Sequence, residues 1–229
     1  LRHQPRRVLE IGAGTGLILF AVVPEVSHYH AVDFSSAAIR KLRRALDKRP
    51  DLATKCATSC GAAHQLLALP GLADGGFDTI VINSVTQHFE SAKYLERVLS
   101  DVAQLLPHGG TVFLGDVTCR STRTLHFTSV ESVRGGRGLA TGELMRRVTK
   151  RLADDQELTV DPAWFYHLPS RLNRIATVEV QLKPGGYENE MSQYRFDVVL
   201  RVAPVGTGER PGARPTAPEV LPWSAIDQG

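Results

Sequence analysis

The chain has 229 residues, enough for one domain with a full-sized hydrophobic core. A hydrophobic content of 42% and a charged content of 22% are typical of a globular protein. The formal net charge of +3 is small for this length and argues against nucleic-acid binding, which normally needs basic residues gathered on one face. The densest basic run, residues 40–49, has the spacing of a solvated helix face, with Ile39, Leu42 and Leu46 on the other side.

Three cysteines, Cys56, Cys60 and Cys119, are an odd number without zinc-like pairing, so we expect free thiols in a reducing compartment. Neither a signal peptide nor an apolar run long enough to cross a membrane is visible, and we expect a cytoplasmic protein. No cluster of His, Cys and carboxylate residues has ligand spacing, so no metal site is expected. The chain starts at Leu1 and enters a strand almost at once, which suggests a fragment of a longer protein.

Strand and helix signals alternate along the first half of the chain, as is typical of an α/β fold with a mainly parallel sheet. The expected strands are residues 8–11, 28–33, 53–58, 77–83 and 111–117. The expected helices are residues 17–23, 35–49 and 92–106; the last carries an apolar stripe that stops at Pro107.

The pattern changes after residue 120. Residues 120–172 contain helical stretches but no strong strand, and two further strands, 177–183 and 194–202, close the domain. The segment between these two strands suits a hairpin with a long loop. Residues 203–229 are rich in Pro, Gly, Ala and Thr, so we expect a domain over 1–202 followed by a linker or tail.

The clearest motif is Glu-Ile-Gly-Ala-Gly-Thr-Gly at residues 10–16, between the first strand and the first helix. Glycines there let the backbone turn tightly and approach a ligand closely. The spacing is G-x-G-x-G rather than the G-x-G-x-x-G of dinucleotide enzymes. Glu10 suits a cationic sulfonium and amino group better than a pyrophosphate, and Asp33 ends the second strand, where a carboxylate can accept both ribose hydroxyls. An NAD site and a tight turn without a ligand are the alternatives.

This loop, together with Val32-Asp-Phe-Ser35, resembles class I methyltransferases that use S-adenosylmethionine (SAM) and release S-adenosylhomocysteine. The resemblance implies a Rossmann-like, seven-stranded, mainly parallel sheet with helices on both faces and a C-terminal antiparallel strand pair. It also implies that the glycine loop holds the methionine part, Asp33 the ribose, and the segment near Ala62 and Ala63 the adenine. Many relatives carry an Asp in that last segment, where this chain has residues 60–64, Cys-Gly-Ala-Ala-His. The expected cofactor residues are Glu10, Gly12, Ala13, Gly14, Gly16, Asp33, Phe34, Ala62, Ala63 and Asn83.

The fourth expected strand runs into a polar segment that ends at His88. Imidazole has an ordinary pKa near neutrality, so His88 can take a proton from a methyl acceptor. Asp116, at the end of the fifth strand, would orient the imidazole if the two strands are neighbours. A polar cluster that merely caps the next helix is the alternative interpretation.

Four later segments, residues 82–91, 115–117, 160–165 and 189–200, narrow the resemblance to methyltransferase domains embedded in nonribosomal peptide synthetases. The match runs from about Val8 to Val202. Such domains usually methylate the backbone nitrogen of an aminoacyl group tethered to a carrier protein, so a carrier protein and an adenylation domain are the implied partners. The residues expected to position the acceptor are Gln87, Tyr187, Asn189, Glu190 and Arg195.

Other interpretations stay open at this point. Family members often carry Tyr in place of His88, and a His paired with a strand-five acid also resembles polyketide carbon methyltransferases. A free-standing O- or C-methyltransferase of secondary metabolism is one alternative, and a non-catalytic scaffold that keeps the fold is another. The intact glycine loop and Asp33 argue against the scaffold.

Overall fold

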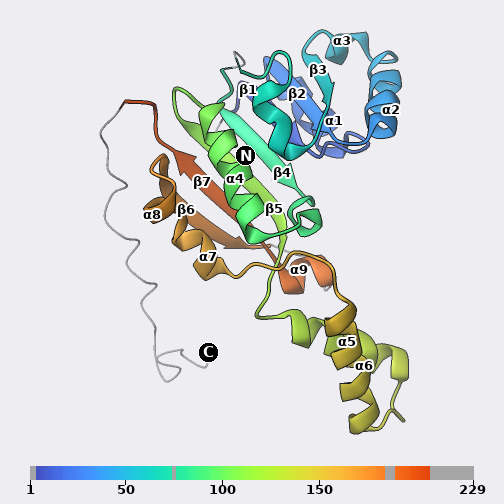
Figure 1. Cartoon of the computed structure of the whole chain (residues 1–229). Helices are drawn as coiled ribbons and strands as arrows, with labels where there is room; N and C mark the ends of the chain where they lie inside the picture. Colours follow the sequence, from blue (N-terminus) through green and yellow to red (C-terminus); the bar gives the residue numbers. More distant parts are fainter. Residues whose placement is uncertain (1–3, 74–75, 184–188, 207–229) are drawn as a thin grey trace, which may run out of the picture.

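Seven strands form one mixed sheet in the computed structural model of the chain, which describes residues 4–73, 76–183 and 189–206 (Figure 1). The strand order is β3-β2-β1-β4-β5-β7-β6, in which β7 is antiparallel to both of its neighbours and the other pairs are parallel. The strands are β1 Arg7–Ile11, β2 His28–Asp33, β3 Cys56–Cys60, β4 Thr79–Asn83, β5 Gly110–Thr118, β6 Ile175–Leu182 and β7 Arg195–Val202. The predicted seven-stranded sheet with a C-terminal antiparallel pair is confirmed.

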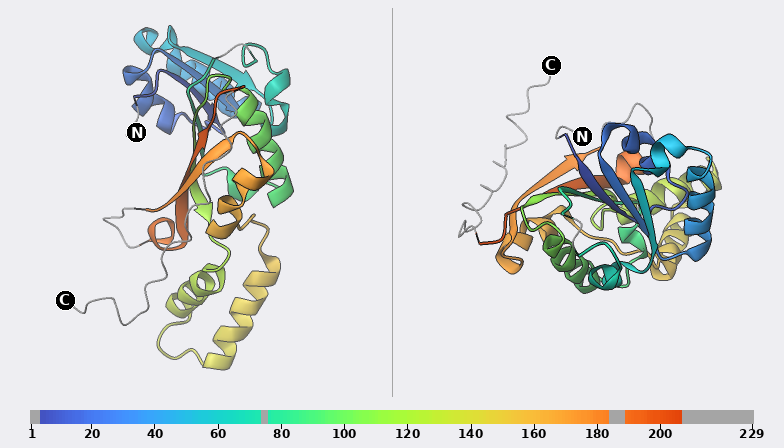
Figure 2. Two further views of the ribbon diagram at one scale, coloured as in Figure 1. Left: turned by 90° about the vertical axis from the view of Figure 1, so that its left-hand side faces the viewer. Right: turned by 90° about the horizontal axis from the view of Figure 1, so that it is seen from above.

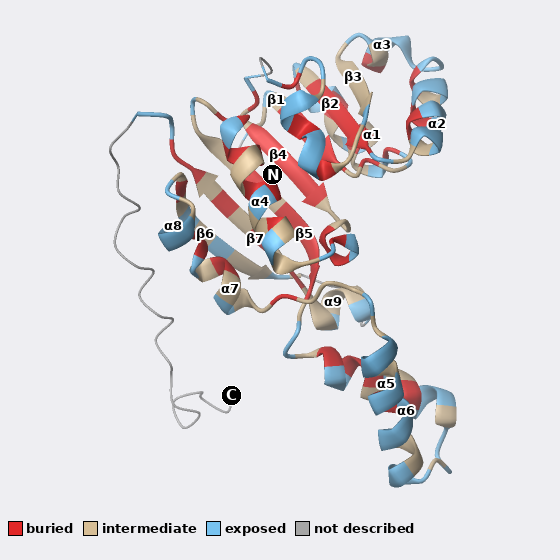
Figure 3. Cartoon of the chain, viewed as in Figure 1, coloured by how far each residue is buried: buried red, intermediate tan, exposed pale blue. Residues whose placement is uncertain are grey.

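Helices cover both faces of this sheet, as the sequence predicts (Figures 1 and 2). Successive side chains of a strand point to opposite faces, so in β1 Val8 belongs to one hydrophobic cluster and Leu9 to the other. Helices α1, α2 and α3 contribute to the Val8 cluster, and α4, α7 and α8 to the Leu9 cluster. These helices are α1 Leu17–Val22, α2 Ser36–Leu46, α3 Pro50–Ala53, α4 Ala92–Gln104, α7 Pro162–Tyr166 and α8 Leu168–Arg171. Buried residues are concentrated in the central strands (Figure 3).

The third strand begins later than the sequence analysis expected. Residues 50–53 form helix α3, because Pro50 occupies its first position, where a missing backbone N–H costs nothing. Strand β3 therefore starts at Cys56, which pairs with Tyr29 of β2. The last strand also starts one residue late, because Asn189 caps a short helix, α9 (Glu190–Tyr194), by accepting a hydrogen bond from the Ser192 backbone N–H at 3.1 Å.

Residues 120–172 form helices, as expected, and two of these helices extend well away from the sheet. Helices α5 (Arg123–Gly135) and α6 (Thr141–Asp154) pack together as a hairpin that follows β5 and projects away from the sheet (Figures 1 and 2). α5 also contacts α9, so the base of the hairpin touches the segment that leads into β7.

Packing continues slightly past the expected domain boundary at residue 202. Ala203 is buried and its backbone N–H donates to the Arg174 carbonyl at 2.8 Å. Most of the expected linker lies outside the described residues. Within the described part of the chain, none of the helices is both long and apolar enough to cross a lipid bilayer.

Candidate active site

The glycine loop connects β1 to α1 and needs its glycines for two different reasons. Gly12, Gly14 and Gly16 have φ values of 81°, 52° and 86°, in the left-handed region that residues with a side chain rarely adopt. A Cβ on Gly12 would lie 2.2 Å from Val85 Cγ2, whereas a Cβ on Gly14 would meet nothing within 4 Å. The loop therefore packs tightly at Gly12 and leaves open space at Gly14.

Asp33 ties this loop to the end of β2. Its carboxylate is buried, and it accepts backbone N–H groups of Gly14 and Ser35, each at 2.8 Å. Each of these bonds uses a different carboxylate oxygen. Since a carboxylate can accept about four hydrogen bonds, Asp33 retains capacity for hydroxyl donors.

A cleft of about 380 Å³ opens beside the loop and Asp33, at the carboxyl ends of the parallel strands. Six of the predicted site residues line it: Gly12, Asp33, Phe34, Ala62, Ala63 and His88. The lining also includes Val85, Phe89 and Tyr94, which the sequence analysis did not single out. The rings of Phe89 and Tyr94 are edge to face with centroids 4.9 Å apart, and the Tyr94 hydroxyl is 3.0 Å from His64 Nδ1. Val85 and Phe89 lie in the turn that follows β4, which ends at this edge, and that position is the signal that could have identified these two residues.

Other predicted cofactor residues lie behind the cleft lining. Ala13 is buried, and Gly16 begins α1. Glu10 is buried beneath the loop, where it accepts a hydrogen bond from the Tyr29 hydroxyl at 2.8 Å. Burial raises the pKa of the Glu10 carboxyl to about 7, although the Tyr29 hydrogen bond acts in the opposite direction. Asn83 donates to Ser84 Oγ at 3.1 Å and to Asp116 Oδ2 at 3.4 Å.

The structure does not bring the described side chains of His88 and Asp116 into the expected pair. β4 and β5 are neighbours, with Asn83 opposite Gly115, as the expectation required. Within the described residues, however, the His88 and Asp116 side chains share no hydrogen bond or ion pair. Asp116 instead accepts a hydrogen bond from Ser84 Oγ and pairs with Lys183 Nζ at 2.5 Å, because Lys183 at the end of β6 reaches across to it. Burial alone would raise the pKa of the Asp116 carboxyl, but the Lys183 and Ser84 hydrogen bonds outweigh it and hold the pKa below its usual range.

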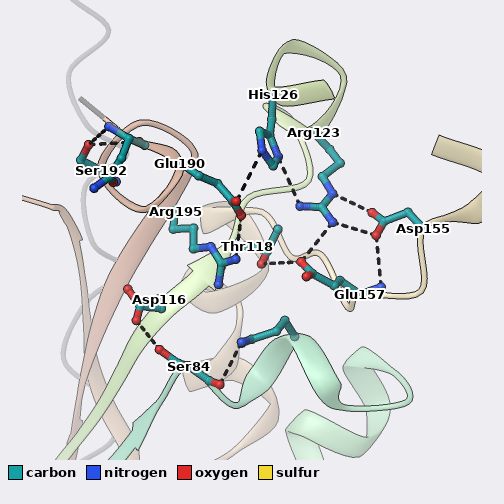
Figure 4. Close-up of polar contacts among 12 residues, drawn as sticks. Ser84, Asp116, Thr118, Arg123, His126, Asp155, Glu157, Glu190, Ser192 and Arg195 are labelled. Atoms are coloured by element: carbon teal, nitrogen blue, oxygen red, sulfur yellow. Dashed lines mark hydrogen bonds and ion pairs between the residues drawn. The ribbon is translucent and has the colours of Figure 1, made fainter. Parts of the chain in front are cut away.

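The predicted acceptor residues of the C-terminal segment gather at the start of β7 (Figure 4). Arg195 Nη2 donates to Glu190 Oε1 at 2.7 Å, and Asn189 caps α9 as described above. Gln87 lies on the other side of the site, in the turn after β4, and donates to the Ser84 carbonyl at 2.8 Å. Tyr187 lies outside the described residues.

A charged network that the sequence analysis missed braces this segment against α5 (Figure 4). His126 Nε2 lies 3.7 Å from Glu190 Oε2, and its ring stacks on Tyr194 with centroids 4.8 Å apart. Arg123, which is 3.5 Å from His126 Nδ1, pairs with Asp155 at 2.6 Å and with Glu157 at 3.0 Å. These residues come from three separate segments, α5, residues 155–157 and α9, and no spacing in the sequence connects the three.

Known proteins match this fold and this motif. A family model described as a methyltransferase domain matches residues 9–112. The chain is 37% identical over 216 residues to chondramide synthase of Chondromyces crocatus, covering 94% of this chain and 5% of that protein. It is 32% identical over 202 residues to enniatin synthase of Fusarium equiseti, covering 86% of this chain and 6% of that protein. The chain thus corresponds to a small part of these relatives.

A solved structure supports the fold independently. The magnesium protoporphyrin IX methyltransferase of Synechocystis, crystallised with S-adenosylhomocysteine, aligns with a TM-score of 0.56 at 14% identity, over 88% of this chain and 76% of that one. The sheet order, the glycine loop and the cleft beside Asp33 define a class I methyltransferase with SAM as its cofactor. Within that class, the chain is related to methyltransferase segments of nonribosomal peptide synthetases. Among the described residues, no group of three His, Cys, Asp or Glu side chains is arranged to hold a metal ion.

Proposed function

We propose that this domain methylates the amine nitrogen of an aminoacyl or peptidyl group tethered to a carrier protein during nonribosomal peptide synthesis. The observation that carries the proposal is the match to peptide synthetases over about nine-tenths of this chain, at 37% and 38% identity in chondramide synthase and in the synthetase CymA of Salinispora arenicola. A carrier protein and an adenylation domain of the same assembly line are then its partners.

The cleft suits SAM in shape and chemistry. The open space at Gly14 admits the methionine part, and the Asp33 carboxylate is placed to accept the ribose hydroxyls. Phe34, which is 79% exposed, offers a flat apolar surface opposite Ala62 and Ala63 for the adenine ring. When bound, SAM supplies an electrophilic methyl group on a sulfonium.

The chain's own residues then position the acceptor and receive its proton. The nitrogen lone pair forms the new bond to the methyl carbon, the carbon–sulfur electron pair stays on sulfur, and one N–H proton leaves the product amine. His88 lines the cleft and is exposed, so its imidazole can receive that proton and release it to solvent. Asp116 acts through Ser84, which also lines the cleft, by holding the Ser84 hydroxyl in place.

The test is methyl transfer to an aminoacyl thioester on the phosphopantetheine arm of a carrier protein, followed by tandem mass spectrometry to locate the methyl group. We expect N-methylation of the tethered group and none of the free amino acid. Methylation at oxygen or carbon of a diffusible substrate would instead favour a free-standing small-molecule enzyme. A chain that binds no S-adenosylhomocysteine would favour a non-catalytic scaffold.

A further inference from the structure

Three buried polar atoms have no hydrogen-bond partner among the described residues: Thr86 Oγ1, Gln87 Oε1 and Arg195 Nε. A fourth, Asp116 Oδ1, lies 2.5 Å from Lys183 Nζ and is satisfied by that ion pair. Leaving a buried donor or acceptor unpaired is unfavourable, so such atoms commonly mark a place where a ligand binds.

The free atom of Gln87 is an acceptor. Its Nε2 donates to the Ser84 carbonyl at 2.8 Å, which fixes the orientation of the side-chain amide and leaves Oε1 as the free end. The residue is only 7% exposed. Oε1 can therefore accept a hydrogen bond from an N–H or O–H group of a bound molecule, in competition with little water.

The free atom of Arg195 is a donor. Arg195 Nη2 is held by Glu190, which in turn faces His126, so the guanidinium cannot easily turn away. The Arg195 side chain is 10% exposed. Its Nε–H can therefore donate to a carbonyl oxygen.

Both residues act on one pair of side chains, Ser84 and Asp116, Gln87 by its hydrogen bond to Ser84 and Arg195 by its charge near Asp116. Gln87 lies between Thr86 and His88 in the turn that follows β4, and it contacts Ser84, a residue of the cleft lining. Arg195 pairs with Thr118 across β5 and β7, and its charge contributes to the low pKa of Asp116. Figure 4 shows the Arg195 guanidinium projecting into the space between Thr118 and Asp116, with Ser84 on the far side of Asp116.

We propose that Arg195 Nε and Gln87 Oε1 form a two-point site for an α-aminoacyl group, in which Arg195 donates to the acyl carbonyl oxygen and Gln87 accepts one amine N–H. This rests on the proposed function and adds the groups that select its substrate. A neutral primary amine has two N–H bonds and one lone pair. With one N–H held by Gln87 and the neighbouring carbonyl held by Arg195, rotation of the amine is restricted and its lone pair is directed toward the cofactor cleft.

The test compares three hydrolysis-resistant mimics of an aminoacyl thioester by calorimetry in the presence of S-adenosylhomocysteine, at a pH high enough to keep their amines neutral. The first is an alanyl amide of N-acetylethylenediamine, the second has CH₂ in place of the alanyl carbonyl, and the third has a hydroxyl in place of the amine. We expect wild type to bind the first about tenfold more tightly than either of the others, the loss typical of one hydrogen bond to a charged or buried group.

Two variants assign each contact. Arg195→Lys keeps the charge that pairs with Glu190 but has no Nε–H, so it should bring the affinities for the carbonyl and CH₂ mimics within about twofold of each other while keeping the preference for the amine. Gln87→Met should bring the affinities for the amine and hydroxyl mimics within about twofold of each other while keeping the preference for the carbonyl. The matched controls Arg201→Lys, on the same strand, and Gln104→Met, at the exposed end of α4, should keep both preferences.

Equal weakening of all three mimics by Arg195→Lys would overturn the two-point site, as would equal wild-type affinities for them. If a variant misfolds and no longer binds S-adenosylhomocysteine, the affinities of wild type for the three mimics alone test the two-point site. Wild type that N-methylates a carrier-bound aminoacyl group without these preferences would leave the proposed function standing and this site wrong. Wild type that binds none of the mimics and methylates no carrier-bound substrate would overturn both.

Discussion

Ser84 and Asp116 are the two non-glycine residues with positive φ in the described part of the chain, at 56° and 62°, and their side chains are hydrogen-bonded to each other. They occupy equivalent places, since one follows β4 and the other lies near the end of β5. Left-handed backbone costs of order 1–3 kcal/mol at such residues and persists where surrounding contacts enforce it. Here the enforcing contacts are their own hydrogen bond and the Lys183 ion pair.

The first prediction concerns the backbone at Asp116. Asp116→Ala and Asp116→Gly remove the same contacts, but only glycine adopts a φ of 62° freely. We expect Asp116→Gly to have the higher free energy of unfolding, by about 1 kcal/mol, in urea denaturation. The control is Thr111 on the same strand, where Thr111→Ala should be more stable than Thr111→Gly. The same order at both positions would contradict the strain argument.

The second prediction concerns Gly12. Gly12→Ala places a methyl group against Val85, so we expect it to lower the melting temperature and abolish binding of S-adenosylhomocysteine. Adding Val85→Ala should restore part of the stability, because it removes the atom that clashes. Gly14→Ala, where space is open, should cost only about 1 kcal/mol, from its backbone conformation. Equal losses at Gly12 and Gly14 would show that contact with Val85 does not matter.

The third prediction concerns Asp33. Asp33→Ala should weaken binding of S-adenosylhomocysteine by about 1.5–3 kcal/mol in calorimetry, because it removes charge-assisted hydrogen bonds. The affinity of Asp33→Asn should lie between those of wild type and Asp33→Ala, since one side-chain oxygen remains for the Gly14 N–H. Asp47→Ala removes the same charge from an exposed position after α2 and should leave affinity unchanged. Unchanged affinity in Asp33→Ala would remove this residue from the cofactor site.

The contact between the glycine loop and Asp33 was predictable from sequence, whereas the partners of Asp116 were not. A glycine loop and a strand-end carboxylate act within one βα unit, so their spacing along the chain encodes their geometry. The role of Asp116 depended on Lys183, which follows β6 and reaches Asp116 only because the antiparallel strands β6 and β7 extend the sheet beside β5. His126 and Arg123 likewise depend on how α5 packs, and helix packing leaves no fixed spacing in the sequence.

Dependence on contacts between distant segments also explains why the start of the third strand was predicted too early. The sequence analysis expected a strand at residues 53–58, but Ala53 is the last residue of helix α3. Pairing with β2 selects residues 56–60 as the strand, and that pairing is a contact between distant segments.

The fourth prediction concerns pH and Glu10. Its folded pKa of about 7 lies above its ordinary value of 4.5, so its contribution to stability is present below pH 4.5 and is lost as pH rises through 7. Glu10→Gln removes this titration. We therefore expect the stability of Glu10→Gln relative to wild type to rise by about 2–3 kcal/mol between pH 4 and pH 8. The exposed substitution Glu90→Gln is the control; a Glu10→Gln difference as flat as that of the control would rule out the raised pKa.

The fifth prediction concerns His88. His88→Ala should slow methyl transfer about a hundredfold, as expected for loss of a general base, while the affinity for S-adenosylhomocysteine changes by less than about threefold. Single-turnover assays and calorimetry measure the two effects separately. His108→Ala, an exposed histidine in the turn before β5, should affect neither. Full turnover in His88→Ala would assign proton removal to another group or to water.

The place of β7 late in the chain determines when the Arg195 side of the site is completed. The cleft lining ends at Tyr94, whereas Arg195 begins the final strand. During synthesis, therefore, all residues of the cleft lining emerge from the ribosome long before Arg195 does. Until β7 arrives, β5 has an open edge with unpaired backbone groups, which is a site for wrong strand pairing. A truncation before β7 should thus impair solubility even though it removes no residue of the cofactor cleft.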